Sequence, residues 1–171
     1  MATIEDIHAL PEGIRAELID GVIYYPKIPL TMHQGMVVEL GTDIQNYIKD
    51  KRRECKVYSV PFPVYLQGDR HYVEPDIFVI CDKDKLDERG CNGAPDWIIE
   101  VISPGNASYD TIVKLELYIN SGVREYWVVD LEYKKVFVYC KNMCSVYGFT
   151  KVKSCIFEDL EIDFSLICDD L

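Results

Sequence analysis

The chain has 171 residues, of which 49% are hydrophobic, and it carries a formal net charge of −11. A chain of this length and hydrophobic content is long enough to bury a substantial core, so we expect a single domain over residues 1–171. The acidic balance argues against a protein that binds nucleic acid through a broad basic surface, because such binding depends largely on phosphate neutralisation.

Targeting and membrane segments are not expected. Residues 1–6 are acidic and lack the apolar stretch of a secretory leader. No apolar run approaches the roughly 20 residues that a membrane span needs. We therefore expect a cytoplasmic protein that has no membrane partner.

The first third of the chain predicts a helix, a hairpin and a second helix. Thr3 followed by Asp6 is typical of a capped short helix that ends near Ala9. Residues 15–25 predict a β-hairpin, because two short apolar runs flank a tight Asp20-Gly21 turn. Apolar residues then recur at helical spacing from Thr31 to about Lys51, which indicates a long helix.

The remaining elements complete an α+β order within the broader α/β class. Residues 57–66 are extended but contain Pro61 and Pro63, which confines them to an edge or an irregular strand. Strands are expected at about 72–80 and 96–102, followed by a helix at about 108–121. A strand pair is expected at 124–130 and 134–140, and weaker strands at 147–153 and 155–157.

Two carboxylates lie in runs that otherwise predict buried strands. Asp76 is followed by Ile77 to Ile80, and Glu100 is flanked by Trp97 to Ile102. Buried anions in neighbouring strands repel each other unless something positive lies between them. A divalent metal held by oxygen ligands would satisfy both, with Mg²⁺ as the default. The alternative is that one or both acids lie at strand ends and face water.

A lysine on the next helix could supply a further charge near these acids. Lys114 follows Asp110 by four residues, so the two share one face of the helix. A solvated salt bridge is the ordinary explanation of such a pair. However, the connection between the strand of Glu100 and this helix is short, so the helix must fold back beside the strand. Lys114 is then expected near Glu100.

These motifs resemble the PD-(D/E)XK metal-dependent nucleases and, more closely, the Uma-type family, whose members are described as restriction endonucleases. The matching stretches occur in the family's order over roughly residues 15–140. They are residues 17–21, His33, residues 74–77, 99–104, 114–118 and 122–130. The resemblance implies a restriction-endonuclease-like fold, with a mixed central sheet flanked by helices and an N-terminal β-hairpin.

The chain departs from the nuclease signature at one position. Ile102 occupies the place of the signature lysine, on the same strand face as Glu100. An isoleucine cannot position a nucleophile or stabilise a developing anion. The resemblance implies that the lysine has moved to position 114, from where its long side chain could reach the same point.

Three further residues are candidates for supporting roles. Asp110 and Glu17 could hold Lys114 or a second metal, although Glu17 could equally be an exposed strand glutamate. His33 is part of the family match and could shuttle a proton or contact a phosphate; a helix-start histidine with only local partners is the alternative. Tyr126 and Trp127 are expected in the sheet core.

The sequence therefore predicts an endonuclease that hydrolyses DNA phosphodiester bonds with Mg²⁺ or Mn²⁺. Asp76 and Glu100 would bind the metal, a carbonyl of Val101 or a neighbour could add an oxygen ligand, and Lys114 would act in catalysis. Restriction-type enzymes and homo-oligomers in general favour two-fold symmetry, so a homodimer is expected. The competing interpretation is an inactive binding or scaffold protein, which Ile102 and the acidic charge both favour.

The basic residues and the cysteines have ordinary interpretations. The largest basic cluster, between Lys49 and Lys56, follows a helix end, so a solvated helix terminus is favoured over a phosphate track. The seven cysteines contain no Cys-x-x-Cys pair. In a cytoplasmic chain we expect them as reduced, partly buried thiols and not as a zinc site.

Overall fold

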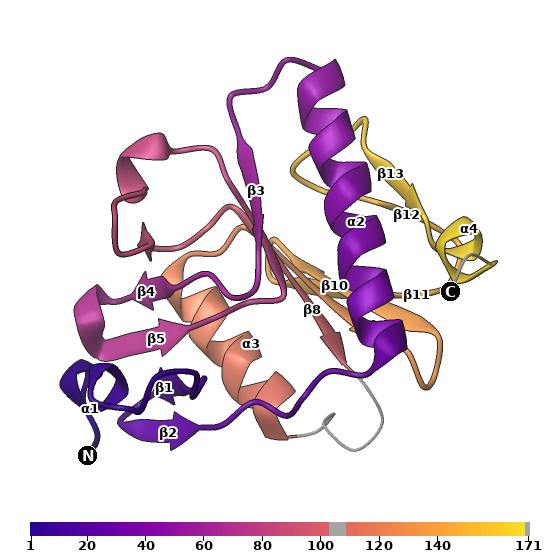
Figure 1. The fold of residues 1–171 in the computed structure, drawn as a ribbon. Helices are drawn as coiled ribbons and strands as arrows, with labels where there is room; N and C mark the ends of the chain where they lie inside the picture. Colours follow the sequence, from indigo (N-terminus) through magenta and orange to yellow (C-terminus); the bar gives the residue numbers. More distant parts are fainter. Residues whose placement is uncertain (103–108, 170–171) are drawn as a thin grey trace.

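Two main β-sheets and four α-helices make up the protein in the computed structural model, which describes residues 1–102 and 109–169 (Figure 1). The helices, with two short 3-10 turns, are α1 (Ile4–His8), α2 (Thr31–Asp50), α3 (Tyr109–Ser121), α4 (Phe164–Asp169), η1 (Gly68–Arg70) and η2 (Lys83–Lys85). None of the described helices has the length and apolar character to cross a membrane.

The larger sheet has six strands in the order β11-β10-β9-β8-β6-β3. Their bounds are β3 Lys56–Ser59, β6 Ile77–Ile80, β8 Trp97–Ile102, β9 Glu125–Asp130, β10 Lys135–Cys140 and β11 Met143–Gly148. The central pair β8 and β9 is parallel, and every other neighbouring pair is antiparallel. α3 lies between β8 and β9 in the chain, as a parallel crossover requires.

The second sheet has five strands in the order β2-β1-β5-β4-β7. Their bounds are β1 Glu17–Ile19, β2 Val22–Tyr24, β4 Val64–Leu66, β5 His71–Val73 and β7 Cys91–Asn92. A separate antiparallel pair, β12 (Lys151–Lys153) and β13 (Glu161–Asp163), leads into α4. The fold is therefore a mixed α+β arrangement with sheets flanked by helices, as the sequence predicts.

The side chains of β8 alternate between two hydrophobic cores, one on each face of the larger sheet. Trp97, Ile99 and Val101 face α2 and pack with its buried residues and with the C-terminal elements. Ile98 faces the opposite side, where α3 and the five-stranded sheet form the second core. Glu100 belongs to this second side, because side chains two residues apart share a face. Figure 1 shows α2 and α3 on either side of the larger sheet.

Most elements lie where the local pattern places them. Thr3 and Asp6 form the expected capping box of α1. Asp20 and Gly21 both have positive φ, 50° and 73°, as the tight turn of the hairpin requires. The long helix α2 and the pair β9–β10 match the expected ranges closely, and Tyr126 and Trp127 are buried in the sheet as expected.

Three expected strands are broken in the structure, and one of them, at 147–153, is divided between the end of β11 and β12, which belong to different sheets. Residues 57–66 separate into β3 and β4, which belong to different sheets, with a cis peptide bond before Pro61. The strand expected over 72–80 is interrupted between β5 and β6, again because the chain passes from one sheet to the other. Asp76 consequently precedes β6 by one residue instead of lying inside a strand.

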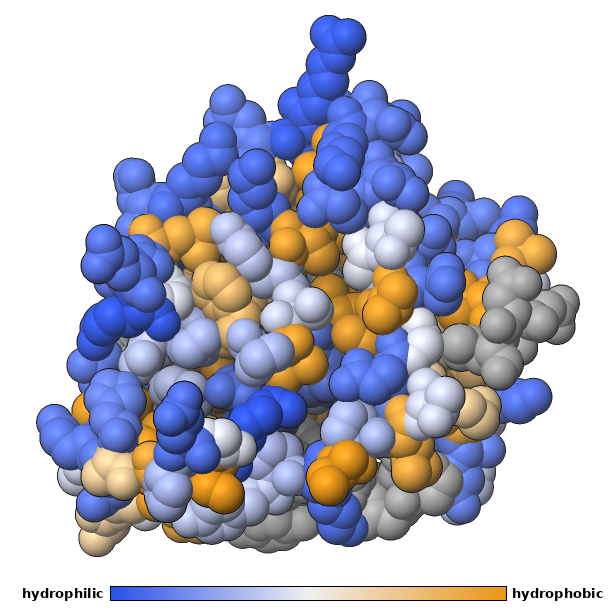
Figure 2. All heavy atoms as spheres, in the orientation of Figure 1, coloured by the Kyte–Doolittle hydropathy of each residue, from blue (hydrophilic) through white to orange (hydrophobic). Residues whose placement is uncertain are grey.

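On the face of the molecule that carries α2, hydrophobic and hydrophilic residues are mixed. Figure 2 shows hydrophilic side chains around the outline and hydrophobic ones interleaved with them across the centre of the face that carries α2. Several large apolar side chains are exposed in the segment between β2 and α2, including Ile28 at 91%. This segment also borders the cavity that contains Asp76 and Glu100.

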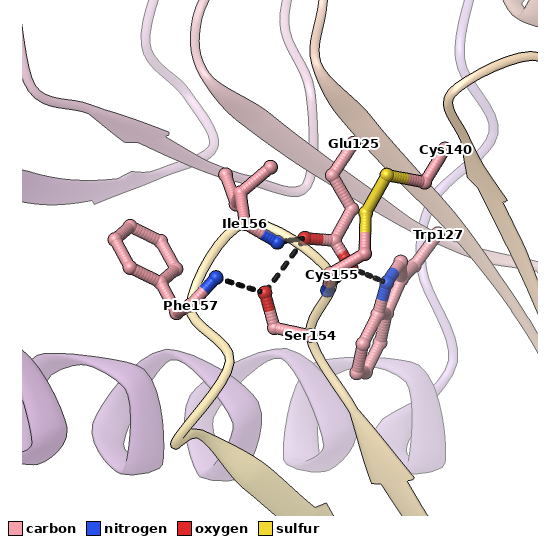
Figure 3. Close-up of a disulfide and its surroundings, with 7 residues drawn as sticks. All are labelled: Glu125, Trp127, Cys140, Ser154, Cys155, Ile156 and Phe157. Atoms are coloured by element: carbon pink, nitrogen blue, oxygen red, sulfur yellow. Dashed lines mark hydrogen bonds between the residues drawn. A yellow bond between two sulfur atoms is a disulfide. The ribbon is translucent and has the colours of Figure 1, made fainter.

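The strand expected at 155–157 is wrong, because this stretch forms a bend around a buried carboxylate (Figure 3). The backbone amides of Cys155 and Ile156 donate to Glu125, at 3.0 and 3.2 Å, instead of to a neighbouring strand. Ser154 Oγ and Trp127 Nε1 also donate to it, each at 2.7 Å. Four donors therefore satisfy a carboxylate that has no exposed surface.

Four cysteines form disulfides, so the expectation of reduced thiols is wrong for them. Cys55 pairs with Cys81 beside the β3–β6 register, and Cys140 of β10 pairs with Cys155 of the bend (Figure 3). The sequence gives no sign of these pairs, because folding brings together cysteines that are 26 and 15 residues apart. Cys91 and Cys144 are free.

Candidate active site

A cavity of about 290 Å³ contains most of the candidate residues. Its wall includes the hairpin β1–β2, the segment before α2, the first turn of α2, the segment before β6, the end of β8, the start of α3, and single residues of β9 and of the chain after β3. Asp76, Glu100 and Lys114 all line it, as do Glu17, His33 and Ile102.

Asp76 is held at the point where the chain enters β6. Its Oδ2 accepts hydrogen bonds from the backbone N–H of Val101, at 2.8 Å, and from His33 Nε2, at 3.1 Å. Among the described residues, nothing donates to Oδ1. One carboxylate oxygen is therefore fixed by β8 and α2, while the other is left for a ligand in the cavity.

Glu100 is a buried carboxylate with two donors on one oxygen. Its Oε1 accepts from Tyr118 Oη at 2.8 Å and from Lys114 Nζ at 3.1 Å. Its Oε2 makes only a long contact, 3.4 Å, with the backbone N–H of Asp76. Burial raises the pKa of Glu100 to about 7, and the Lys114 ammonium opposes that rise.

Lys114 lies where the sequence predicts it, beside the carboxylate of Glu100. Its Nζ is 2.9 Å from Glu17 and 3.1 Å from Glu100. Burial alone would lower the pKa of Lys114, but the two carboxylates outweigh burial and raise it well above its ordinary value. The side chain is therefore a fixed positive charge between two acids. Its part in catalysis stays a prediction.

Glu17 is buried in the hairpin and is not the exposed strand glutamate that the sequence also allowed. Besides its ion pair with Lys114, its Oε1 accepts a hydrogen bond from the backbone N–H of Glu74 at 2.9 Å. This contact ties the hairpin to the segment that carries Asp76. Glu17 thus links Lys114 of α3 to the break before β6.

His33 makes a long-range contact and not only local ones. Because a carboxylate can only accept, His33 Nε2 donates to Asp76. Burial alone lowers the pKa of His33, but the carboxylates of Asp76 and Glu100 outweigh this and raise it. Its Nδ1 is buried and has no hydrogen-bond partner among the described residues.

Three site residues were missed in the sequence analysis. Tyr118 follows Lys114 by one helical turn, and that spacing could have identified it as a second donor to Glu100. Arg15 Nε and Glu74 form an ion pair of 2.7 Å at the cavity wall. No local signal predicts that pair, because its members are 59 residues apart. Asp110 is the second residue of α3, but its side chain lies outside the described part of the chain.

The donor chemistry of the cavity suits a hard divalent cation. Asp76 Oδ1 accepts no hydrogen bond from the described residues, and Glu100 Oε2 accepts only one long hydrogen bond. The N–H of Val101 points to Asp76, and in a strand the carbonyl of the same residue faces the same edge. No cluster of three or more His, Cys, Asp or Glu ligands occurs within the described ranges. A metal here would rely on two carboxylates, a carbonyl and water, a combination that Mg²⁺ accepts.

Matches to known proteins include a family model, a curated relative and a solved structure. A family model for Uma2, described as "Putative restriction endonuclease", matches residues 4–163. An "Uncharacterized protein slr1290" of Synechocystis sp. is 26% identical over 127 residues, which covers 74% of this chain and 66% of that protein. A crystal structure from Anabaena variabilis, described as "a putative nuclease belonging to DUF820", superposes with a TM-score of 0.82 at 23% identity. That superposition covers 99% of this chain and 98% of the other, and it shows the same fold.

Proposed function

This chain belongs to the Uma2 family of restriction-endonuclease type, and from this premise we propose that it hydrolyses phosphodiester bonds in DNA with the help of Mg²⁺ or Mn²⁺. Asp76 and Glu100 would hold the metal, and Lys114 would be the cationic catalytic residue. Cytoplasmic location and a homodimer are further parts of the proposal that rest on the sequence alone.

One observation carries the proposal: the Nζ of Lys114 lies 3.1 Å from Glu100, although Ile102 fills the usual lysine position. α3 delivers the charge to the strand that carries Glu100. The cavity therefore combines two acids and one cation from three separate elements, which is the set that the reaction needs.

The chain's own residues would perform distinct tasks. When bound, a divalent cation would polarise the scissile phosphate and lower the pKa of an attacking water. Lys114 would offset negative charge that develops at the phosphate. Tyr118 and Glu17 would hold Glu100 and Lys114 in place, and His33 would orient Asp76 through its hydrogen bond. Val101 fixes the same carboxylate from the backbone.

Substitution of the two acids tests this proposal. Asp76→Ala and Glu100→Ala should each reduce Mg²⁺-dependent cleavage of DNA to background, because each removes a charged metal ligand. Asp50→Ala, an exposed acid at the end of α2, is the matched control and should cleave like the wild type. Circular dichroism would verify that each variant is folded. Cleavage at the wild-type rate by the Asp76→Ala, Glu100→Ala double variant would overturn the assignment.

The second candidate is a nuclease fold that binds without cutting. Ile102 in the lysine position and the net charge of −11 both favour it. Calorimetric titration with Mn²⁺ separates the two candidates. If the proposed site is intact, the wild type should bind Mn²⁺ and the Asp76→Ala variant should not. No heat of binding at millimolar Mn²⁺ would favour the non-catalytic protein.

A further inference from the structure

The segment between β2 and α2 forms an apolar rim at the mouth of the cavity. We call Tyr25, Ile28 and Leu30 the rim; they are 60%, 91% and 58% exposed, and all three line the cavity. Exposed apolar groups that border a polar cavity are typical of a binding surface. On the face in Figure 2, hydrophobic and hydrophilic residues are interleaved in the region of β2 and α2.

The rim is held open by its own backbone. Tyr25 precedes Pro26 and Ile28 precedes Pro29, and a residue before proline is driven toward extended conformations. The prolines themselves have a restricted φ. The backbone of Tyr25 and Ile28 is therefore restricted, so ordering it around a ligand would cost less conformational entropy.

The interior of the cavity also offers an unused donor. Tyr126 is 2% exposed and lines the cavity, and its hydroxyl has no hydrogen-bond partner within the part of the chain that the structure describes. An unsatisfied buried hydroxyl is costly unless a ligand or water pairs with it. A volume of about 290 Å³ is near the lower end for small-ligand sites, which suits one nucleotide unit and not a duplex.

The charges around the cavity do not form a phosphate track. Its ionised lining groups, His33 aside, are the acids Glu17, Glu74, Asp76 and Glu100 and the cations Arg15, Lys27 and Lys114. Arg15 and Lys114 form ion pairs with lining acids, and Lys27 is not without a partner either. A duplex binder neutralises about six to ten phosphates, and this lining cannot do so.

We propose that the rim binds the bases of an unpaired DNA strand, so that the substrate of this cavity is single-stranded DNA. The inference rests on the proposed function. Tyr25 would stack on a base, and Ile28 and Leu30 would contact neighbouring base or sugar faces. Base stacking tolerates any sequence and needs little positive charge, which agrees with the acidic composition.

Fluorescence anisotropy tests the inference. It compares binding of a labelled 12-nucleotide single strand with binding of a hairpin duplex of the same sequence. Ca²⁺ is present as a hard cation that prefers oxygen ligands. Tyr25→Ala should weaken single-strand binding by about 5- to 100-fold, the scale of one lost stacking contact. Tyr25→Phe keeps the ring and should bind within about twofold of the wild type. Tyr133→Ala, an exposed tyrosine in the turn after β9, is the matched control and should change nothing.

The salt dependence gives an independent measure. If Arg15 and Lys27 each contacted one phosphate of a single strand, the slope of log K against log salt would be no steeper than about −1.4, because each phosphate contact contributes about −0.7. A duplex bound along six or more phosphates would give about −5 or steeper. Equal or tighter binding of the duplex, or unchanged single-strand binding by Tyr25→Ala, would overturn the inference.

The outcomes also separate this inference from the proposed function. Tyr25-dependent binding of single strands without cleavage in Mg²⁺ would contradict the hydrolase proposal and leave the ligand assignment intact. Cleavage of duplex DNA but not of single strands would support the hydrolase proposal and contradict the single-strand inference. If Ile28→Ser changes the sedimentation coefficient and not DNA affinity, the rim contacts a second copy of this chain and the inference is wrong.

Discussion

Ile102 and Lys114 together show how the same charge can reach a site from a different element. Ile102 lines the cavity and packs with the second core, so its position favours an apolar side chain. Lys114 approaches from α3 and pairs with two acids that would otherwise repel each other. At this scale the site depends on the placement of one ammonium group.

Lys114→Ala should lower DNA cleavage by about a hundredfold or more, the scale of losing one charge-stabilising group. The double variant Lys114→Ala, Ile102→Lys should recover part of that activity, because residue 102 lines the same cavity. Steady-state cleavage rates with Mg²⁺ provide the measurement. Lys114→Met, which keeps the aliphatic stem, serves as the control for packing. A wild-type rate in Lys114→Ala would remove the lysine from the mechanism.

The C-terminal end of α2 is tied to the turn between β12 and β13. Asp159 accepts a hydrogen bond from Tyr47 Oη and forms ion pairs with Lys51, at 3.0 Å, and Arg53, at 3.1 Å. Two members of the basic cluster therefore bind an acid of their own chain, whereas the sequence favoured a solvated helix terminus. The hydrogen bond from Tyr47, followed by that from Lys51, holds the pKa of Asp159 well below its usual range.

This contact predicts a pH-dependent contribution to stability. A carboxyl whose folded pKa is depressed stabilises the fold above its unfolded pKa of about 3.9, and the contribution is lost as pH falls through the folded value. Asp159→Asn should therefore have a slightly lower Tm than the wild type at pH 7, and the difference should shrink below about pH 4. Glu158→Gln, its exposed neighbour, is the control for thermal melts across pH. A difference that is constant with pH would contradict the assignment.

Across the whole molecule, two disulfides join residues that lie 26 and 15 positions apart in the chain. Cys55–Cys81 links the edge strand β3 to the chain after β6. Cys140–Cys155 links β10 to the bend at 155–157 (Figure 3). The backbone amides of this bend donate hydrogen bonds to Glu125. Because the cytoplasm keeps most thiols reduced, the state of these bonds bears directly on the predicted location.

Reduction should destabilise the protein measurably. Closing a loop of 15 residues is worth about 3 kcal/mol in the chain-entropy description, so a thiol reductant should lower Tm by several degrees. A Cys140→Ser, Cys155→Ser variant should start lower and respond less to reductant. Thiol titration in denaturant without reductant gives the check: of the seven cysteines, at most the three outside the disulfides should react. Seven reactive thiols would refute the pairing.

Local patterns in the sequence determined most of the helices and strands and identified the candidate acids. The capping box at Thr3, the Asp20-Gly21 turn and the helical spacing of Lys114 each act within a few residues, so the chain itself encodes them. The order of strands and helices, together with the acids in apolar runs, was enough to indicate the family and the candidate residues.

Only the tertiary structure decided which distant groups meet. The ion pair of Arg15 with Glu74, the burial of Glu17 and the hydrogen bond from His33 to Asp76 join residues from different elements. The bend at 155–157 likewise forms because a buried carboxylate from β9 needs donors. Packing and the cost of burying an unpaired charge determine such contacts. Both act between segments that are distant in the sequence, so a local pattern does not predict them.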